Sequence, residues 1–151
     1  MCQASDRDSK PQTLIRETSS AAETEALAAQ LARGLVHGDV VLLEGELGSG
    51  KTTFVRGVVR ALGITDPVNS PTFSIGHRYI GKRVNVSHLD LYRIQALTPQ
   101  EQTLIEDYLT GEEIALVEWP EVADGRLPRP CVRISLTHLG EDRRRIEVES
   151  L

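Results

Sequence analysis

The chain has 151 residues, of which 40% are hydrophobic and 26% are charged, and its formal net charge at pH 7 is −5. This length favours one domain with a substantial apolar core, and the composition is ordinary for a soluble globular protein. The negative charge argues against a broad nucleic-acid-binding surface, because phosphate contacts need clustered lysine and arginine, although contact through a partner protein is not excluded.

The cysteines and the first residues bear on where the protein works. Two cysteines, Cys2 and Cys131, do not make a disulfide framework, so we expect a reducing, cytoplasmic compartment. No apolar run reaches transmembrane length, and Met1–Lys10 lacks the apolar segment of a signal peptide, so no membrane association is expected. We expect a disordered tail over residues 1–12 and a single domain over residues 13–151.

Strand and helix signals alternate along the chain. The expected strands are Thr13–Glu17, Val40–Leu43, Thr72–Tyr79, Val84–Leu89, Ile114–Val117, Cys131–Thr137 and Arg145–Glu149. The expected helices begin after Ser20, Gly50 and Thr98, and the first and third open with the capping-box pattern Ser/Thr-x-x-Glu. Two strands are entirely apolar, which is typical of parallel strands buried on both faces. This order predicts an α/β protein with a mostly parallel central sheet, helices on both faces and antiparallel C-terminal strands.

A phosphate-binding loop lies between the second expected strand and the second expected helix. Gly45–Thr52 reads Gly-Glu-Leu-Gly-Ser-Gly-Lys-Thr, which matches Gly-x4-Gly-Lys-Ser/Thr at every position. Its glycines allow backbone N–H groups to face phosphate oxygens, Lys51 carries charge toward the β- and γ-phosphates, and the Thr52 hydroxyl suits Mg²⁺. The expected nucleotide-binding residues are Gly45, Glu46, Leu47, Gly48, Ser49, Gly50, Lys51, Thr52 and Thr53. The setting predicts a P-loop NTPase-like three-layer α/β/α sandwich.

Two acidic residues at strand ends are candidate partners of the metal, because Mg²⁺ prefers hard oxygen ligands. Glu118 follows four apolar residues, the pattern of a second metal-binding motif with Glu in place of the commoner Asp. The alternative is a solvated residue at the end of a strand. Asp90 is either another carboxylate of the same metal site or a residue that caps a turn.

Four further residues each allow two interpretations. The Thr72 hydroxyl, in Ser70-Pro71-Thr72-Phe73, either senses the γ-phosphate and metal as switch loops do, or belongs to a turn before an edge strand. Trp119 is either a core anchor or an aromatic wall beside the nucleotide. Arg93 and Arg143 could contact the nucleotide, by neutralising phosphate charge or by stacking on a base. The alternative is that they form surface salt bridges. The run Arg143–Arg145 is interpreted as a solvated turn.

Four motifs in this order and spacing resemble the TsaE (YjeE) family, the small bacterial P-loop ATPases of tRNA threonylcarbamoyladenosine (t6A) synthesis. They are Gly45–Thr53, Ser70-Pro71-Thr72-Phe73, His88-Leu89-Asp90-Leu91-Tyr92-Arg93 and Val117-Glu118-Trp119-Pro120. The phosphate loop alone occurs in many families, and the combination is what makes the resemblance specific. It covers about residues 14–149.

The resemblance implies a role for each matched residue. Lys51 and the loop backbone would bind the phosphates of ATP, and Thr52 and Glu118 would hold Mg²⁺. Asp90 would orient the attacking water or a metal-bound water, and Thr72 would lie in a mobile, switch-like loop. Lys51, Thr72, Asp90 and Glu118 are thus the expected catalytic residues.

The resemblance also implies where the nucleotide base lies and which proteins are partners. Residues around Ser20–Thr24 and Arg143 would approach the adenine side, and Trp119 and Arg143 are included among the cofactor-binding residues. The implied partners are TsaD, which carries the transferase site, and TsaB, which pairs with it, so that tRNA is involved only indirectly. ATP hydrolysis would support repeated turnover of that complex without performing the carbamoyl transfer. Glu46 stands where the family has Asp, and little effect is expected, because this side chain should point away from the phosphates.

Three other functions are alternatives to an ATPase that acts on a tRNA-modifying enzyme. A small-molecule kinase needs an acceptor pocket and usually a lid, and the elements predicted after Thr53 leave few residues for a lid. A GTPase is disfavoured, because the chain has neither an Asn-Lys-x-Asp nor an Asp-x-x-Gly motif. A non-catalytic, nucleotide-dependent binding module remains an alternative.

Hydrolysis would be in-line attack of water on the γ-phosphate. It would be slow until a partner orders the Thr72 loop or supplies a charge.

Overall fold

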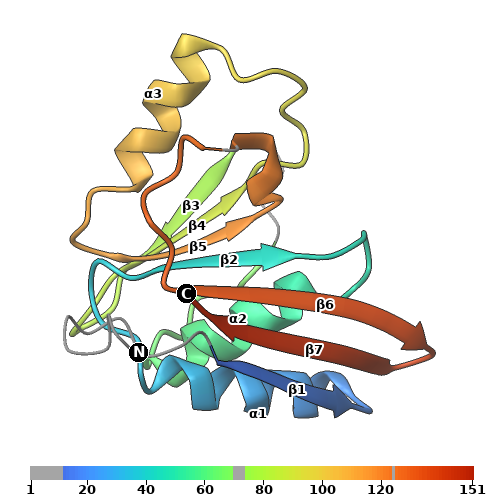
Figure 1. Ribbon diagram of the computed structural model, residues 1–151. Coiled ribbons are helices and arrows are strands. Elements are labelled where there is room, and N and C mark those ends of the chain that lie inside the picture. Colours follow the sequence, from blue (N-terminus) through green and yellow to red (C-terminus); the bar gives the residue numbers. More distant parts are fainter. Residues whose placement is uncertain (1–11, 70–73, 124) are drawn as a thin grey trace.

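The computed structural model describes residues 12–69, 74–123 and 125–151. Within these ranges the chain forms a seven-stranded sheet in the order β1-β7-β6-β2-β5-β4-β3 (Figure 1). The strands are β1 Thr13–Thr18, β2 Val40–Glu44, β3 Gly76–Tyr79, β4 Val86–Asp90, β5 Ile114–Glu118, β6 Val132–Gly140 and β7 Arg143–Ser150. The helices are α1 Ala21–Ala32, α2 Lys51–Ala61 and α3 Pro99–Tyr108, with a short 3-10 helix, η2, at Pro120–Ala123.

The centre of the sheet is parallel and its margins are antiparallel. Strand β2 pairs in parallel with β5 and β6, and β5 pairs in parallel with β4. Strand β3 adds antiparallel to β4 at one edge, and β7 and β1 add antiparallel beyond β6 at the other. The predicted mostly parallel centre with antiparallel C-terminal strands is therefore confirmed.

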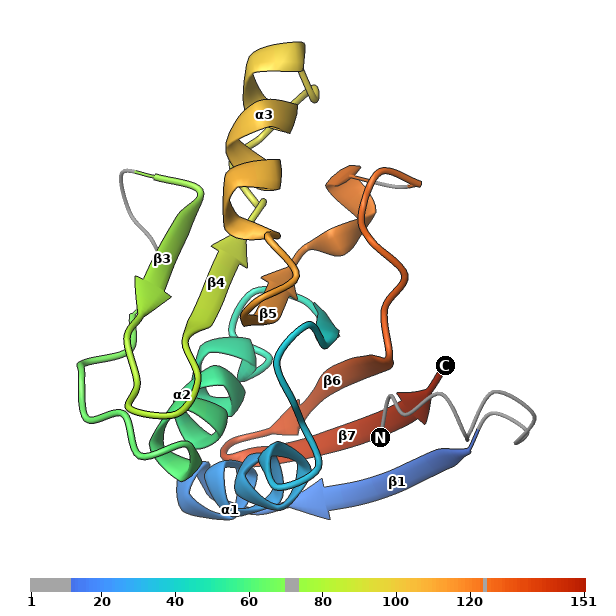
Figure 2. The ribbon, with the colours of Figure 1, turned by 90° about the vertical axis from the view of Figure 1, so that its left-hand side faces the viewer.

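Helices cover both faces of the sheet, which explains why the central strands are apolar throughout. Side chains alternate between the two faces along a strand. Val41 and Leu43 of β2 pack in the core that contains α1 and α2, whereas Val40 and Leu42 pack in the core that contains Ile105 of α3. Figures 1 and 2 show α1 and α2 on one side of the sheet and α3 on the other. The three-layer α/β/α prediction is confirmed. None of the helices in the described part of the chain is long and apolar enough to cross a membrane.

The predicted capping boxes form, one of them with a shift of one residue. At α3, Thr98 Oγ1 accepts from Glu101 N at 3.2 Å, and the Glu101 carboxylate accepts from Thr98 N at 2.9 Å. At α1, Ser20 Oγ accepts from Glu23 N at 3.1 Å, but the Glu23 carboxylate accepts from Ser19 N at 2.5 Å instead of from Ser20. Both arrangements satisfy N–H groups that the start of a helix leaves unpaired.

Three expectations from the sequence differ from the structure or lie partly outside the described residues. Arg143–Arg145 is not a turn, because the turn lies at residues 141–142, where Glu141 has a φ of 49°, and the arginines begin β7 opposite β6. The strand expected at Thr72–Tyr79 begins only at Gly76, and residues 70–73 lie outside the described residues. Residues 1–11 of the expected tail also lie outside them, while the carbonyl of Gln12 accepts from Ser150 N at 2.9 Å.

Candidate nucleotide-binding site

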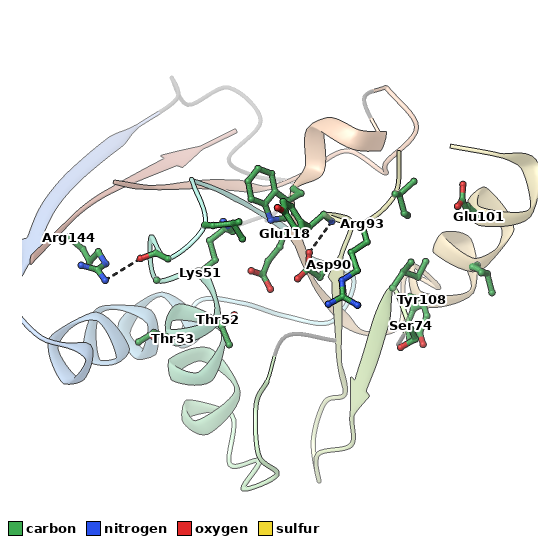
Figure 3. A pocket seen from close by; sticks show the side chains of 18 residues that line it. Lys51, Thr52, Thr53, Ser74, Asp90, Arg93, Glu101, Tyr108, Glu118 and Arg144 are labelled. Carbon is green, nitrogen blue, oxygen red and sulfur yellow. Dashed lines mark hydrogen bonds between the residues drawn. The ribbon is translucent and has the colours of Figure 1, made fainter. Parts of the chain in front are cut away.

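The carboxyl ends of three neighbouring parallel strands meet at one edge of the sheet, where ligands bind in folds of this kind. Strand β2 ends at the phosphate loop, β4 ends at Asp90 and β5 ends at Glu118. A cavity of about 880 Å³ opens at this edge (Figure 3). It is lined by Leu47, Gly48, Gly50, Lys51, Thr52, Thr53, Ser74, Ile75, Asp90, Tyr92, Arg93, Ile94, Glu101, Leu104, Tyr108, Glu118, Trp119 and Arg144.

The phosphate loop delivers the N-terminus of α2 to this cavity. Gly50 caps α2 with a φ of 104°, a left-handed conformation that favours glycine. The first hydrogen bond of the helix runs from Phe54 N to the Gly50 carbonyl at 2.9 Å. The N–H groups of Lys51, Thr52 and Thr53 therefore have no acceptor within the helix. They belong to the positive end of the helix dipole, which attracts anions.

Lys51 is buried, with 6% of its surface exposed, and it is held by the loop that carries it. Its ammonium donates to the carbonyl oxygen of Gly45 at 2.5 Å and to that of Glu46 at 3.0 Å, and it lies 4.3 Å from the centroid of the Trp119 ring. Burial lowers the pKa of Lys51, and the neighbouring Glu118 carboxylate opposes that shift most strongly.

The two predicted carboxylates lie side by side in the sheet. Asp90 and Glu118 are register partners on β4 and β5, and both line the cavity beside Lys51 (Figure 3). The Asp90 carboxylate accepts from Tyr92 N at 3.1 Å in the turn after β4, which confirms the turn interpretation. Asp90 also lines the cavity, and its role as a carboxylate of the metal site stays a prediction. Glu118 is only 2% exposed, so the alternative of a solvated strand-end residue is wrong.

Trp119 packs against the core and also borders the cavity, and its place beside a nucleotide stays a prediction. It has a φ of 57°, which is uncommon for a residue other than glycine, and this sharp turn follows directly after Glu118. Its ring packs against the core on the α3 side, stands 5.0 Å from the Tyr92 ring and receives the Lys51 ammonium over its face. Trp119 is thus both a partial core anchor and a wall of the cavity.

The structure separates the predicted Arg143 from the cavity and brings its neighbour there instead. Arg143 is exposed and forms an ion pair with Glu17 at 3.4 Å. Arg144 lines the cavity and donates to the carbonyl of Gly48 at 3.2 Å (Figure 3). Adjacent residues of a strand point in opposite directions, so assigning a turn to this segment concealed which arginine faces the loop. Arg93 lines the cavity as well.

The remaining predicted residues fall in three places. Gly45 and Glu46 line a second cavity of about 420 Å³, which Trp119 also borders. Ser49 is buried, with 1% of its surface exposed. Thr72 lies outside the described residues.

A residue without a predicted role, His88, contacts Glu118. The His88 Nε2 and Glu118 Oε2 atoms are 2.5 Å apart, and both side chains are buried. His88 and Asp90 are two positions apart on β4, and the alternation of a strand puts such residues on one face. That period is the signal by which sequence analysis could have placed His88 near the site.

The oxygen atoms that line the cavity suit Mg²⁺ better than a metal ion whose ligands must all come from protein side chains. Among the described residues no group of three or more His, Cys, Asp or Glu side chains is arranged to hold a metal ion. Magnesium bound with a nucleotide usually takes one or two carboxylates together with phosphate oxygens and water. Thr52, Asp90 and Glu118 supply hard oxygen atoms at a single cavity.

The fold and the site define an α/β protein of the P-loop class. The chain belongs to the TsaE family: the sequence model of that family, Threonylcarbamoyl adenosine biosynthesis protein TsaE, matches residues 18–146. This confirms the resemblance seen in the sequence motifs.

Two relatives agree with this assignment, and both carry the name tRNA threonylcarbamoyladenosine biosynthesis protein TsaE. The Bacillus subtilis protein is 40% identical over 124 residues, 82% of this chain and 77% of the relative. The Treponema pallidum protein is 36% identical over 129 residues, 85% of this chain and 95% of the relative. The crystal structure of Bacillus subtilis YdiB matches with a TM-score of 0.77 and 33% identity, covering 93% of this chain and 87% of that one.

Proposed function

We propose that this protein binds ATP with Mg²⁺ and hydrolyses it in support of the t6A modification of tRNA. It would act on a complex of TsaB- and TsaD-like proteins, without transferring the carbamoyl group itself. The observation that carries the proposal is the convergence of Lys51, Thr52, Asp90 and Glu118 on one cavity at the carboxyl edge of the sheet. The names of the relatives support the assignment to t6A synthesis.

In this proposal the residues of the phosphate loop bind the nucleotide. The Lys51 ammonium would exchange the carbonyls of Gly45 and Glu46 for phosphate oxygens, which are stronger acceptors because they are charged. The N–H groups at the start of α2 would bind phosphate as well. Thr52 and Glu118 would hold Mg²⁺, which neutralises charge on the β- and γ-phosphate oxygens when bound.

Asp90 would orient the attacking water. Oxygen of that water bonds to the γ-phosphorus while the bond from this phosphorus to the β–γ bridging oxygen breaks, and ADP leaves. The proton released by the water passes to the phosphate product. Lys51 stabilises the charge that develops on the phosphate oxygens, an effect that is strongest where bulk water is excluded.

We infer that hydrolysis is slow in the isolated protein and faster with its partner. The rim of the cavity exposes apolar side chains of Leu47, Tyr92 and Leu104, at 65%, 48% and 45% of their surface. A protein seated on this rim would bury them and exclude water from the phosphates.

The decisive experiment is capture of purified TsaB- and TsaD-like proteins by the tagged chain with ATP, with ADP and without nucleotide, together with the rate of phosphate release. Capture that depends on the nucleotide, with faster phosphate release in the complex, is the expected result. Full-speed hydrolysis by the chain alone, unchanged by the complex, would contradict partner stimulation. Phosphorylation of a small acceptor without capture would favour the kinase alternative, and capture without hydrolysis would favour the binding-module alternative.

A further inference from the structure

His88 is a buried histidine that lies directly behind the carboxylate of Glu118. Its exposed fraction is 0%, and that of Glu118 is 2%. The two residues come from neighbouring parallel strands and are thirty positions apart, and their Nε2 and Oε2 atoms are 2.5 Å apart. Glu118 faces the cavity (Figure 3), whereas His88 is not among the residues that line it. The contact therefore reaches the cavity only through Glu118.

The chemistry of the pair assigns a direction to this hydrogen bond. A carboxylate that is to hold Mg²⁺ is ionised and can only accept, so the Nε2–H group of His88 donates. A single bond to Oε2 restricts rotation of the carboxylate and leaves Oε1 for the cavity. Without this donor, the buried carboxylate would lose one of the interactions that offset the free-energy cost of its desolvation.

The surroundings of His88 argue against a purely structural role. Its other ring nitrogen, Nδ1, is buried without a hydrogen-bond partner in the part of the chain that the structure describes. The ring is stacked on Tyr79, with centroids 6.2 Å apart and an angle of 24° between the planes, and Tyr79 is 1% exposed. An apolar side chain of similar size would fill this position without burying an unpaired nitrogen. Contact with Glu118 is what a histidine adds here.

We propose that His88 is a positioning residue that orients the Glu118 carboxylate for the binding of Mg²⁺ with the nucleotide. This rests on the proposed function, in which Glu118 is a ligand of the metal. Residues that hydrogen-bond a metal ligand from behind typically contribute 10- to 100-fold to metal affinity or activity. His88 would act on the metal and would not touch the nucleotide.

The test is a binding measurement that does not depend on turnover. The affinity for a fluorescent, non-hydrolysable ATP analogue is measured over a range of Mg²⁺ concentrations and in EDTA. The variants are His88→Leu, which removes the donor, and His88→Gln, whose amide nitrogen reaches the position of Nε2. His77→Leu is the matched control, because His77 is the register partner of His88 on β3 and is exposed. Thermal unfolding checks that each variant folds.

For His88→Leu we expect the Mg²⁺ concentration at half-saturation to rise about 10- to 100-fold, while the affinity in EDTA stays within about twofold of wild type. His88→Gln should recover most of the Mg²⁺ dependence, and His77→Leu should match wild type. If His88→Leu does not fold, His88→Asn replaces it, because its shorter amide is polar but falls short of Glu118.

Two results would overturn the inference. One is a folded His88→Leu or His88→Asn variant with the Mg²⁺ dependence of wild type. The other is His88→Gln being as impaired as the variant without the donor. Failure of the proposed function is distinguishable, because then the wild-type chain would show no Mg²⁺-dependent binding of the ATP analogue. If wild type binds with Mg²⁺ and Glu118→Gln responds equally, Glu118 is not the metal ligand and the role of His88 falls with it.

Discussion

The Lys51 ammonium donates to the carbonyl oxygen of Gly45 at 2.5 Å, so the phosphate loop closes on its own lysine. A second carbonyl, that of Glu46, and the face of Trp119 also contact this charge, and the Glu118 carboxylate is a neighbour. The neutral partners offset part of the cost of burying the ammonium. Under the proposed function, a bound triphosphate would replace these contacts of Lys51 and add charge neutralisation.

Replacement of Lys51 by Met should weaken ATP binding by about 10- to 100-fold, because a hydrogen bond to a charged group contributes about 1.5–3 kcal/mol. Calorimetric titration with ATP measures the loss. Arg60→Met is the control, because Arg60 is an exposed cation of the same helix that pairs with Glu25. Equal affinities of Lys51→Met and wild type would contradict a phosphate-binding role.

Replacement of Glu118 by Gln should impair Mg²⁺-dependent hydrolysis at least about tenfold and should weaken nucleotide binding in EDTA little, because the lost charge acts through the metal. Asp90→Asn in parallel should lower the rate with a smaller change in Mg²⁺ dependence, since its proposed contact is with water. Phosphate release over a range of Mg²⁺ concentrations separates the two. If hydrolysis is unchanged in Glu118→Gln and the Mg²⁺ dependence is altered in Asp90→Asn, Asp90 and not Glu118 is the ligand of the metal.

Trp119 is the only tryptophan of the chain, so its fluorescence reports on this site alone. Departure of the Lys51 ammonium from the ring should change the emission when ADP or ATP binds. A fluorescence titration should give the same dissociation constant as calorimetry. Ile80→Ala, at an exposed position outside the cavity, should keep the signal. Saturation by calorimetry with constant emission would contradict the rearrangement.

The neighbouring arginines of β7 offer a matched pair of substitutions. Arg144→Ala should weaken nucleotide binding about threefold to tenfold, because Arg144 lines the cavity and supports the loop at Gly48. Arg143→Ala should change it less than about twofold, since an exposed ion pair such as that with Glu17 contributes 0–1 kcal/mol and lies elsewhere. The reverse ranking in the same binding assay would restore Arg143 to the nucleotide site.

The buried Tyr79 makes the free energy of unfolding depend on pH in the alkaline range. Burial raises the pKa of Tyr79 above its ordinary value of 10.0, and a hydrogen bond from the Asn69 backbone opposes this shift. Because the folded state holds the phenolic proton more tightly, the associated stability is fully present below pH 10 and is lost as the pH rises through the folded-state pKa.

Tyr79→Phe should accordingly be less stable than wild type at neutral pH, by about 1 kcal/mol for the lost hydrogen bond. Above pH 10 the difference should shrink, because Phe has no proton to lose. Urea unfolding at several pH values measures both. Tyr92→Phe is the control, because Tyr92 is half exposed. A stability difference for Tyr79→Phe that is constant with pH would contradict this account.

Much of the fold was predictable because its determinants are short. The capping box at Thr98, the apolar run of β5 and the phosphate loop each depend on fewer than ten consecutive residues. Propensity and periodicity act over this range, and they were sufficient for the α/β class and for the edge of the sheet where ligands bind. The cap of α1 shows the limit of such short patterns. The sequence pattern does not distinguish whether the Glu23 carboxylate accepts from Ser20 N or, as observed, from Ser19 N, because local geometry decides between these adjacent groups.

The sequence by itself determined that this is an α/β protein with a phosphate loop, two acidic strand ends and the motifs of the TsaE family. Only the tertiary structure decided that His88 contacts Glu118, that Arg144 and not Arg143 faces the loop, and that Trp119 lies against the Lys51 ammonium. The physical reason is register. Each of these contacts joins residues that are far apart in the chain, and a shift of one position along a strand would reverse which side chain reaches the site.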